Sequence, residues 1–313
     1  MKKTIKKRAF VSAIAMLIVS AIVLTSSTFA WFSMSKEASV ESMDLTVSSP
    51  EGIQISANAS TWTANLTIDE IFHADTSTSR YKAYENNINL MPADLIPVSS
   101  CLHRFNSTTG TANFFKVTLN DSGYGTVTNV NQVAGNDNEA GLVAFDLFFK
   151  LAKDTKVYFG TSEFVDNSDS DILTAMRVAF QFLGNTSSTV ADDAIALKTT
   201  SASTSIIYEI DSTGRSADAI SAGNSTGYIA TSYVKETNAS QKVNSNFVLS
   251  NSYVGAPSCT VLKDTDAKTA KSFDLKAGVS KVRIYIWVEG QDIDCRNSVA
   301  GAALSAALKF TID

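Results

Sequence analysis

One stretch of this 313-residue chain matches a catalytic motif: Gly223–Gly227, which reads Gly-Asn-Ser-Thr-Gly. The pattern Gly-x-Ser-x-Gly is that of a nucleophile elbow, in which a serine on a tight strand-to-helix turn attacks an acyl group. The elbow needs a strong strand before the serine and a histidine after it, but His73 and His103, the two histidines, both precede Ser225. We therefore attribute the match to the abundance of glycine and serine, and we expect no enzymatic activity.

Carboxylate side chains are a second group that could form a site, because Ca²⁺ prefers oxygen ligands. Asp166, Asp169 and Asp171 lie in one short acidic segment, and the stretch 291–294 (Gln-Asp-Ile-Asp) is a weaker candidate of the same type. The first segment lacks the glycine and the closing glutamate of an EF-hand loop. The sequence favours solvated turns, with a weak calcium site at the three aspartates as the alternative, and no other cofactor is expected.

The three cysteines, Cys101, Cys259 and Cys295, are too few for a disulfide framework and too widely spaced for a zinc site. Cys259 and Cys295 both lie near the C-terminus and are the candidate pair for a single disulfide. A free, buried thiol at each position is the alternative, since unpaired cysteine behaves as a small apolar residue.

Two tryptophans leave a carbohydrate-binding role open. Trp287 alternates away from the aliphatic face of its predicted strand, and Trp62 lies in a separate region of the chain. Both are candidate platforms for a sugar ring. The other aromatic residues at strand spacing are expected in the core.

The elements that position these residues follow a leader. Five cations in the first eight residues precede an uncharged apolar run at 9–24, and small residues then lead to Ala30 and the aromatic Trp31. This is the layout of a secretory signal peptide at 1–30, cleaved between Ala30 and Trp31. The apolar run is shorter than the ~20 residues that cross a bilayer. Retention of 1–30 as a membrane anchor is the alternative.

Charge and composition narrow the class of protein. The leader holds five of the 26 basic residues and none of the 31 acidic ones, which leaves residues 31–313 with a net charge of about −10. Such a surface repels nucleic acid. We expect a secreted protein, extracellular or at the cell surface, that meets the membrane only through residues 1–30 before cleavage.

Alternating apolar residues predict β-strands along residues 31–313, which we interpret as one domain. We expect one hairpin from 40–47 and 53–56 and a second from 142–151 and 156–159. Further strands are expected near 205–210, 281–289 and 303–312, and 172–183 is expected to begin as a helical turn and end as a strand. The tracts 120–141 and 211–246 are polar and are predicted to be loops. The fold class is all-β, an antiparallel sandwich of jelly-roll type.

Three of the predicted strands have a clear core face. These faces comprise Val143, Phe145, Leu147 and Phe149; Val178, Phe180 and Phe182; and Val282, Ile284, Ile286 and Val288. The opposite face of the last strand carries Arg283, Tyr285, Trp287 and Glu289.

The junction at 28–32, Thr-Phe-Ala-Trp-Phe, is followed by a polar gap and the strand 40–47. This arrangement resembles the leader junction of TasA/camelysin-type secreted proteins of Gram-positive bacteria. The strand 142–151 and the segment 286–290 are also similar to clostridial secreted proteins with this leader. The resemblance covers residues 8–48, is architectural beyond them, and does not account for the polar tracts at 120–141 and 211–246.

The resemblance implies cleavage by a dedicated signal peptidase and assembly into extracellular fibres of a biofilm matrix. In such fibres the freed N-terminal segment of one subunit adds as a strand to the next, which makes a head-to-tail homopolymer. Carried over to this chain, the donor segment is 31–48. Its donor and anchor residues are Trp31, Phe32, Val40, Met43, Leu45 and Val47. Three alternatives remain: pairing of 40–47 within its own subunit, a membrane-tethered adhesin, and a carbohydrate-binding sandwich.

Overall fold

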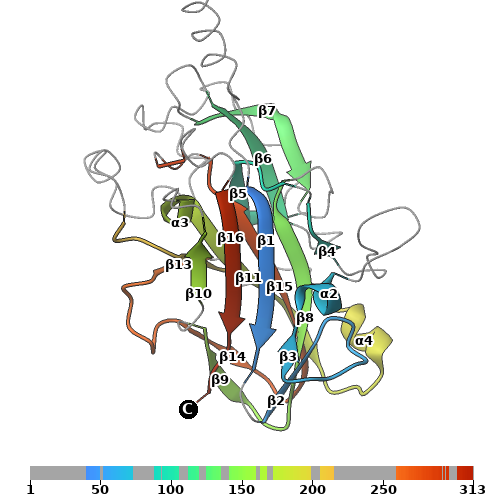
Figure 1. The fold of residues 1–313 in the computed structure, drawn as a ribbon. Coiled ribbons are helices and arrows are strands. Elements are labelled where there is room, and N and C mark those ends of the chain that lie inside the picture. The colour runs from blue at the N-terminus through green and yellow to red at the C-terminus, as the bar shows by residue number, and fades with distance from the viewer. Residues whose placement is uncertain are drawn as a thin grey trace, which may run out of the picture. The chain divides into compact units, whose positions relative to one another are not determined.

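The computed structural model describes residues 40–49, 52–72, 88–92, 94–105, 112–119, 125–134, 141–159, 163–167, 172–198, 205–214, 259–290, 292, 294–295 and 302–312 (Figure 1). The chain divides into Met1–Lys36 and Glu37–Asp313, and every described residue belongs to the second unit. The expected leader, its cleavage site and the motif at 223–227 lie outside the described residues, as do His73, Asp169 and Asp171. Within the described part, no helix is long and apolar enough to cross a membrane.

Strands dominate the described part of the chain and confirm the all-β class. Three short helices accompany them: α2 (Ile68–Ile71), α3 (Ile172–Ala175) and α4 (Ala191–Ile195). The strands are β1 (Val40–Ser48), β2 (Ile53–Ser56), β3 (Asn65–Leu66), β4 (Asn89–Leu90), β5 (Val98–Phe105), β6 (Ala112–Leu119), β7 (Gly125–Ala134), β8 (Val143–Leu151), β9 (Thr155–Tyr158), β10 (Glu163–Asp166), β11 (Met176–Thr186), β12 (Ser205–Glu209), β13 (Cys259–Lys263), β14 (Ser272–Leu275), β15 (Gly278–Val288) and β16 (Ala302–Lys309).

The largest sheet forms one layer of a sandwich. Its strand order is β13-β12-β11-β15-β8-β2, and β4 also pairs with β8. The facing layer holds β10-β16-β1-β3 and the ribbon β14-β9. Tyr158 at the end of β9 exchanges two backbone hydrogen bonds of 2.8 Å with Thr311, just beyond β16. β9 and β10 therefore follow one another along the same side of β16.

Pairing is mostly antiparallel, with two exceptions to the expected antiparallel order. β12 and β13 run parallel, and so do β1 and β16, whose register extends from Val40↔Ala302 to Ser48↔Lys309. The second pair joins the first strand of the domain to its last. Parallel partners need a long connection between them, and here nearly the whole domain supplies it.

Both predicted hairpins are wrong, although their four strands exist. β1 lies in one layer and β2 in the other, and β8 and β9 are separated in the same way. β2 pairs with β8, whereas β9 pairs with β14. Between Ser48 and Ile53, and again between Leu151 and Thr155, the chain thus crosses from one layer to the other. Alternation shows that a strand has an apolar face, but it does not show which strand forms hydrogen bonds along its edge, because side chains point out of the sheet.

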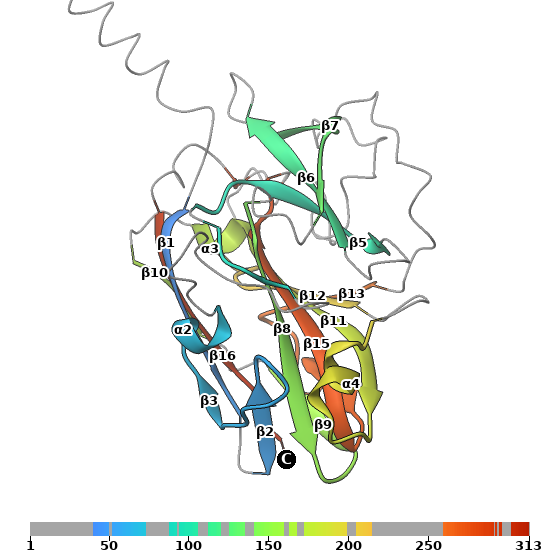
Figure 2. The same cartoon turned by 90° about the vertical axis from the view of Figure 1, so that its right-hand side faces the viewer.

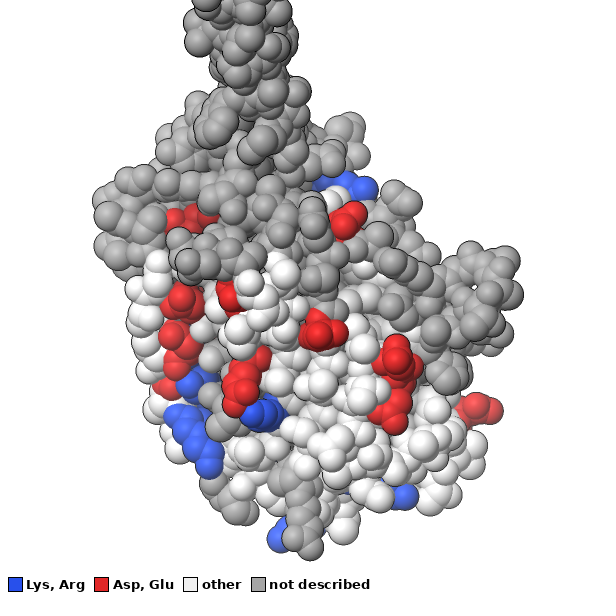
Figure 3. Space-filling model, viewed as in Figure 1, with Lys and Arg blue, Asp and Glu red and all other residues white. Residues whose placement is uncertain are grey.

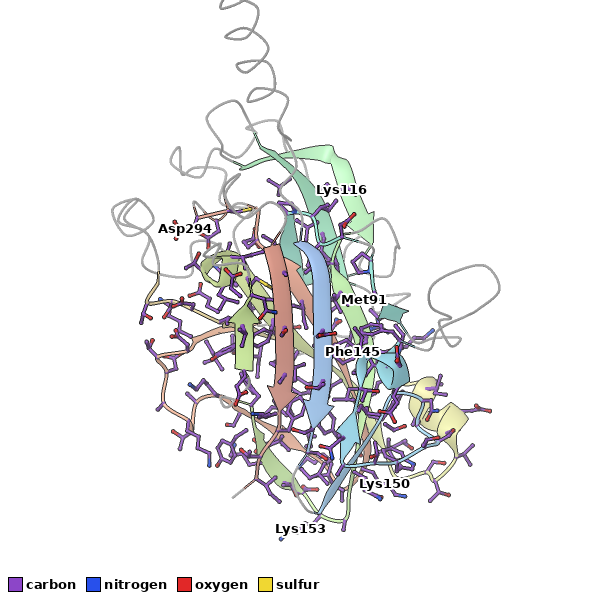
Figure 4. All side chains as sticks on the ribbon, in the orientation of Figure 1. Met91, Lys116, Phe145, Lys150, Lys153 and Asp294 are labelled. Atoms are coloured by element: carbon purple, nitrogen blue, oxygen red, sulfur yellow. The ribbon has the colours of Figure 1, made fainter. Side chains whose placement is uncertain are left out.

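The core between the layers is built from the predicted faces. The inward residues of β8, β11 and β15 are buried there, apart from Phe182, which is partly buried and packs against the same cluster. Phe145 projects from β8 into this space (Figure 4) and meets Phe72 edge-on, with ring centroids 5.6 Å apart. Phe149 and Phe310 make a similar contact at 5.0 Å between β8 and the end of the facing layer.

The other face of the large sheet is buried as well. Phe114 of β6 lies 5.4 Å from the ring of Tyr285 and 5.5 Å from that of Trp287. The backbone N–H of Gly290 donates to the carbonyl of Val98 at 3.0 Å, which ties β5 to the end of β15. The sheet β5-β6-β7 is therefore attached on this side (Figure 2). It includes β7, so the prediction of a loop over 120–141 is wrong.

Candidate functional site: an open groove between two edge strands

The two layers are joined on one side of the sandwich. Ile55, in β2 of the large sheet, exchanges backbone hydrogen bonds of 2.8 and 3.0 Å with Thr63, two residues before β3 of the facing layer. On the opposite side, β13 and β14 each end their sheet within the described residues. The connection 264–271 links these two edge strands at one end only. Among the described residues, the sandwich is closed at β2 and β3 and open at β13 and β14.

A groove of about 460 Å³ occupies the open side. Its lining residues are Phe182, Ile206, Thr260, Leu262, Ala270, Ser272, Phe273 and Asp274. The floor is apolar, because the residues of β12 and β13 that face the core continue into the groove as Ile206 and Leu262. The rim is polar, with Thr260 and Asp274 exposed.

Aromatic rings form the side of the groove nearest β14. Phe273 of β14 lies 5.0 Å from Phe182 of β11 and 5.8 Å from Phe180, measured between ring centroids. Phe273 is nearly fully buried, while Phe182 is only partly covered. An apolar side chain that entered here would cover the exposed part of Phe182 and would be favoured by about 25 cal/mol for each Å² removed from water.

Polar contacts close one end of the groove. The Lys271 ammonium donates to the carbonyl of Asp264 at 2.7 Å, and the Asp264 carboxylate accepts from the Ser212 hydroxyl at 2.5 Å. Burial, followed by the charges of Asp264 and Asp266, raises the pKa of nearby Tyr208 to about 12. The Tyr208 phenol therefore stays protonated at neutral pH. The contacts of Lys271 and Asp264 form a polar cap at this end of the groove.

Within the described residues, the groove offers apolar surface and the edges of two strands. In the described part of the chain, no group of three His, Cys, Asp or Glu side chains could hold a metal ion. Charged side chains on the face shown in Figure 3 stand among uncharged ones, in keeping with a charged content of 18%. Edge strands present backbone groups that can pair with an added strand. An extended segment with apolar side chains is the ligand that this groove fits.

The expected donor strand lies elsewhere in the structure. Leu45 and Val47 are buried in the core, and β1 pairs within its own chain, as in the alternative left open by the sequence. Val40 and Met43 belong to β1, but their side chains lie outside the described set, as do Trp31 and Phe32 altogether. The structure thus brings none of the described donor residues to the groove.

The two acidic segments differ in what the structure shows. Asp166 ends β10, and its two companions fall outside the described residues. Asp292 is buried and accepts from the guanidinium of Arg177 at 2.5 Å. A solvated turn at 291–294 is therefore wrong, because a buried arginine already uses the Asp292 carboxylate.

Cys295 is a free thiol buried in the core. Burial raises its pKa, the charges of Asp292 and Glu289 raise it further, and Arg177 opposes them. The disulfide between Cys259 and Cys295 is not formed, and the free-thiol alternative holds for Cys295. The side chains of Cys101 and Cys259 lie outside the described set, as does that of His103.

Neither tryptophan forms an open platform for a sugar. Trp287 is 0% exposed, and its indole N–H donates to the Glu289 carboxylate at 3.0 Å. Trp62 is half-buried, packs against a cluster that includes Phe148, and carries the Lys150 ammonium 5.3 Å from its ring centroid. The expectation for Trp287 is wrong, because the sheet face opposite the aliphatic one is also covered.

A buried ion cluster on that face was missed by the sequence reasoning. Asp146 of β8 accepts from Arg283 of β15 at 2.7 and 3.0 Å, and from the ammonium of Lys281 at 3.2 Å. Burial, the largest influence, raises the pKa of Asp146, but the two cations outweigh it and hold that pKa below its usual range. The sequence held one signal for this cluster: Asp146 is the one acidic residue in a largely apolar strand, and Lys281 and Arg283 lie in another largely apolar strand.

Comparisons with protein-family models, with curated proteins and with solved structures found no match to this chain. Inferences about function therefore rest on the groove between β13 and β14 and on the resemblance at the junction 28–32.

Proposed function

We propose that this chain is a non-enzymatic extracellular structural protein, the subunit of a surface or biofilm-matrix filament. The N-terminal segment of one copy is donated as a strand to the next copy. The observation that carries the proposal is the apolar groove between the edge strands β13 and β14. An added strand there would satisfy backbone groups of an edge and bury apolar side chains at the same time.

The donated segment follows from where β1 lies. β1 already pairs with β16 over most of its length and contributes Leu45 and Val47 to its own core. Residues 31–39, between the expected cleavage site and β1, are then the part of the donor segment left for a neighbour. A donor at one place and an acceptor at another make a head-to-tail contact, which does not close and therefore extends into a filament.

Export precedes assembly in this proposal. The signal peptidase is a partner only while residues 1–30 are attached, and these residues are also the chain's only contact with the membrane. Cleavage before Trp31 frees the donor, so assembly would start after secretion, as the resemblance to TasA/camelysin-type proteins implies.

The test begins with the full chain, secreted by a Gram-positive host with its own leader. Intact mass and N-terminal sequencing define the start, and negative-stain microscopy of the same sample scores filaments. We expect a start at Trp31 and filaments that deletion of 31–39 abolishes. A start at Met1 in the membrane fraction, without filaments, would replace the proposal with a tethered surface protein.

A second variant tests the groove without disturbing the core. Thr260→Arg places a long cation at the exposed rim and should prevent filaments. Val190→Arg is the matched control, because Val190 is 56% exposed and lies outside the lining of the groove. Filaments from Thr260→Arg as abundant as those from Val190→Arg would remove the groove from the proposal.

A further inference from the structure

We infer that the groove selects two side chains of the donor, Phe32 and Met34 of a neighbouring copy, and that Lys36 of the same segment stays at the rim. This inference rests on the proposed function and adds the register in which the donor binds. It follows from the number of inward-facing positions on β13 and from the alternation of residues 31–36.

β13 offers two inward positions to an added strand. β12 and β13 are parallel, with Ile206 level with Thr260 and Tyr208 level with Leu262. Ile206, Tyr208 and Leu262 all belong to the core between the layers, so Thr260 and Leu262 are the β13 residues on the inner face. A strand added beside β13 would set two of its own side chains level with them.

The groove gives those two side chains unequal surroundings. Leu262 is only 8% exposed and lies toward the end that the connection 264–271 closes, whereas Thr260 is exposed at the open end. Lys271, held to the carbonyl of Asp264, marks the closed end. A third apolar side chain along the same face would reach this polar cap or pass out of the groove, so the apolar site is two residues long.

The donor segment has one face that matches. Residues 31–36 read Trp-Phe-Ser-Met-Ser-Lys, and alternate residues of a strand share a face. One face carries Phe32, Met34 and Lys36, while the other carries Trp31, Ser33 and Ser35. The first face places two large apolar residues at successive positions, followed by a cation. Asp274 on the rim pairs with Lys156 at 2.8 Å, and because both side chains are exposed, Lys36 would join an existing surface pair there.

The other register is disfavoured. It would bury Ser33 beside Ile206 or Leu262, where a hydroxyl without a hydrogen-bond partner is unfavourable. It would also put Phe32 and Met34 on the outer side of the added strand. The two registers therefore make opposite predictions for substitutions at neighbouring positions.

Peptides of residues 31–39 with acetylated N-termini test the register on the secreted wild-type chain, because they avoid any change at the cleavage site. We expect the wild-type peptide to inhibit filament growth, measured by sedimentation. Phe32→Ser and Met34→Ser peptides should need at least about tenfold higher concentrations, since each loses most of a buried side chain. The Ser33→Ala peptide is the matched control and should inhibit within about twofold of wild type.

The outcomes separate the two proposals. Equal inhibition by the Phe32→Ser and Ser33→Ala peptides would overturn the register and leave strand donation in place, provided that filaments still depend on 31–39. Stronger inhibition by Ser33→Ala than by the wild-type peptide, with full inhibition retained by Phe32→Ser, would assign the opposite face. Absence of filaments from the wild-type chain would overturn the proposed function and this inference together.

Discussion

Asp146→Asn tests whether the buried ion cluster is a main determinant of stability. The substitution keeps the size of the side chain but removes its charge. Arg283 and Lys281 then remain buried with no carboxylate between them, since both lie within 3.2 Å of Asp146 and are almost fully covered. Removing one partner of a buried ion pair typically costs about 3–5 kcal/mol, against a total stability of about 5–15 kcal/mol.

The assay is urea unfolding followed by tryptophan fluorescence, for which the buried Trp287 is a suitable reporter. Asp154→Asn is the matched control, because Asp154 pairs with Lys276 at 2.8 Å on the surface. Exposed pairs contribute little, so we expect the control to unfold close to wild type. A midpoint for Asp146→Asn as high as that of Asp154→Asn would refute the reasoning.

Two further measurements separate charge from packing. Replacing Asp146, Lys281 and Arg283 together by apolar residues of similar volume should recover much of the loss, because no unpaired charge then remains.

The pH dependence of this stabilisation has a defined sign as well. The pKa of Asp146 is lowered on folding, so its contribution is present above the ordinary carboxyl pKa and is lost as the pH falls through the folded value. The difference between wild type and Asp146→Asn should therefore shrink only in strong acid.

Three other predictions concern single side chains. Cys295 should resist iodoacetamide in the folded protein and react in urea, as peptide mass spectrometry can show; labelling at the same rate in both conditions would contradict its burial. The pKa of Tyr208 is raised to about 12 from an ordinary value near 10, so stability should fall as the pH rises between these values. Denaturation at several pH values should show a shallower fall for Tyr208→Phe, and an equal fall in both proteins would exclude Tyr208 as its source. Phe145→Ala should lower the free energy of unfolding by about 3–5 kcal/mol, with the exposed Lys153→Ala as a control that leaves the midpoint unchanged.

Strand positions were predictable because alternation is a local property. The faces that carry Phe145, Phe180 and Ile284 were assigned correctly, and so was the change from helical turn to strand within 172–183. These assignments need only the side chains of one segment, since neighbours in a strand point to opposite sides. The all-β class followed from the number of such segments.

Strand partners were not predictable in the same way. Val40–Ser48 was assigned to a hairpin with the next strand and instead pairs with Ala302–Lys309, at the other end of the chain. A short connection favours a neighbour in sequence, but the strands that follow β1 and β8 lie in the opposite layer. β5 and β7 were missed, because their residues show little alternation of apolar and polar side chains.

The groove was also invisible in the sequence. Its lining comes from β11, β12, β13 and β14, and no single segment is marked by an unusual pattern. Ile206 and Leu262 look like ordinary core residues, and they line a groove because β13 and β14 end their sheets within the described part of the chain. The proposed donor had a local signal, since the aromatic pair at Trp31 and Phe32 follows the predicted cleavage site directly.

By itself, the sequence determined the strands that alternate clearly and which face of each is apolar, and it predicts a leader before them. Only the tertiary structure decided which strands pair, that the second face of the large sheet is covered, and where the sandwich stays open. The reason is physical. An apolar face specifies burial but not the surface that buries it, and Asp146 meets Arg283 across 137 residues of chain. Such contacts depend on which strands pair and in which register, and no stretch of residues encodes that alone.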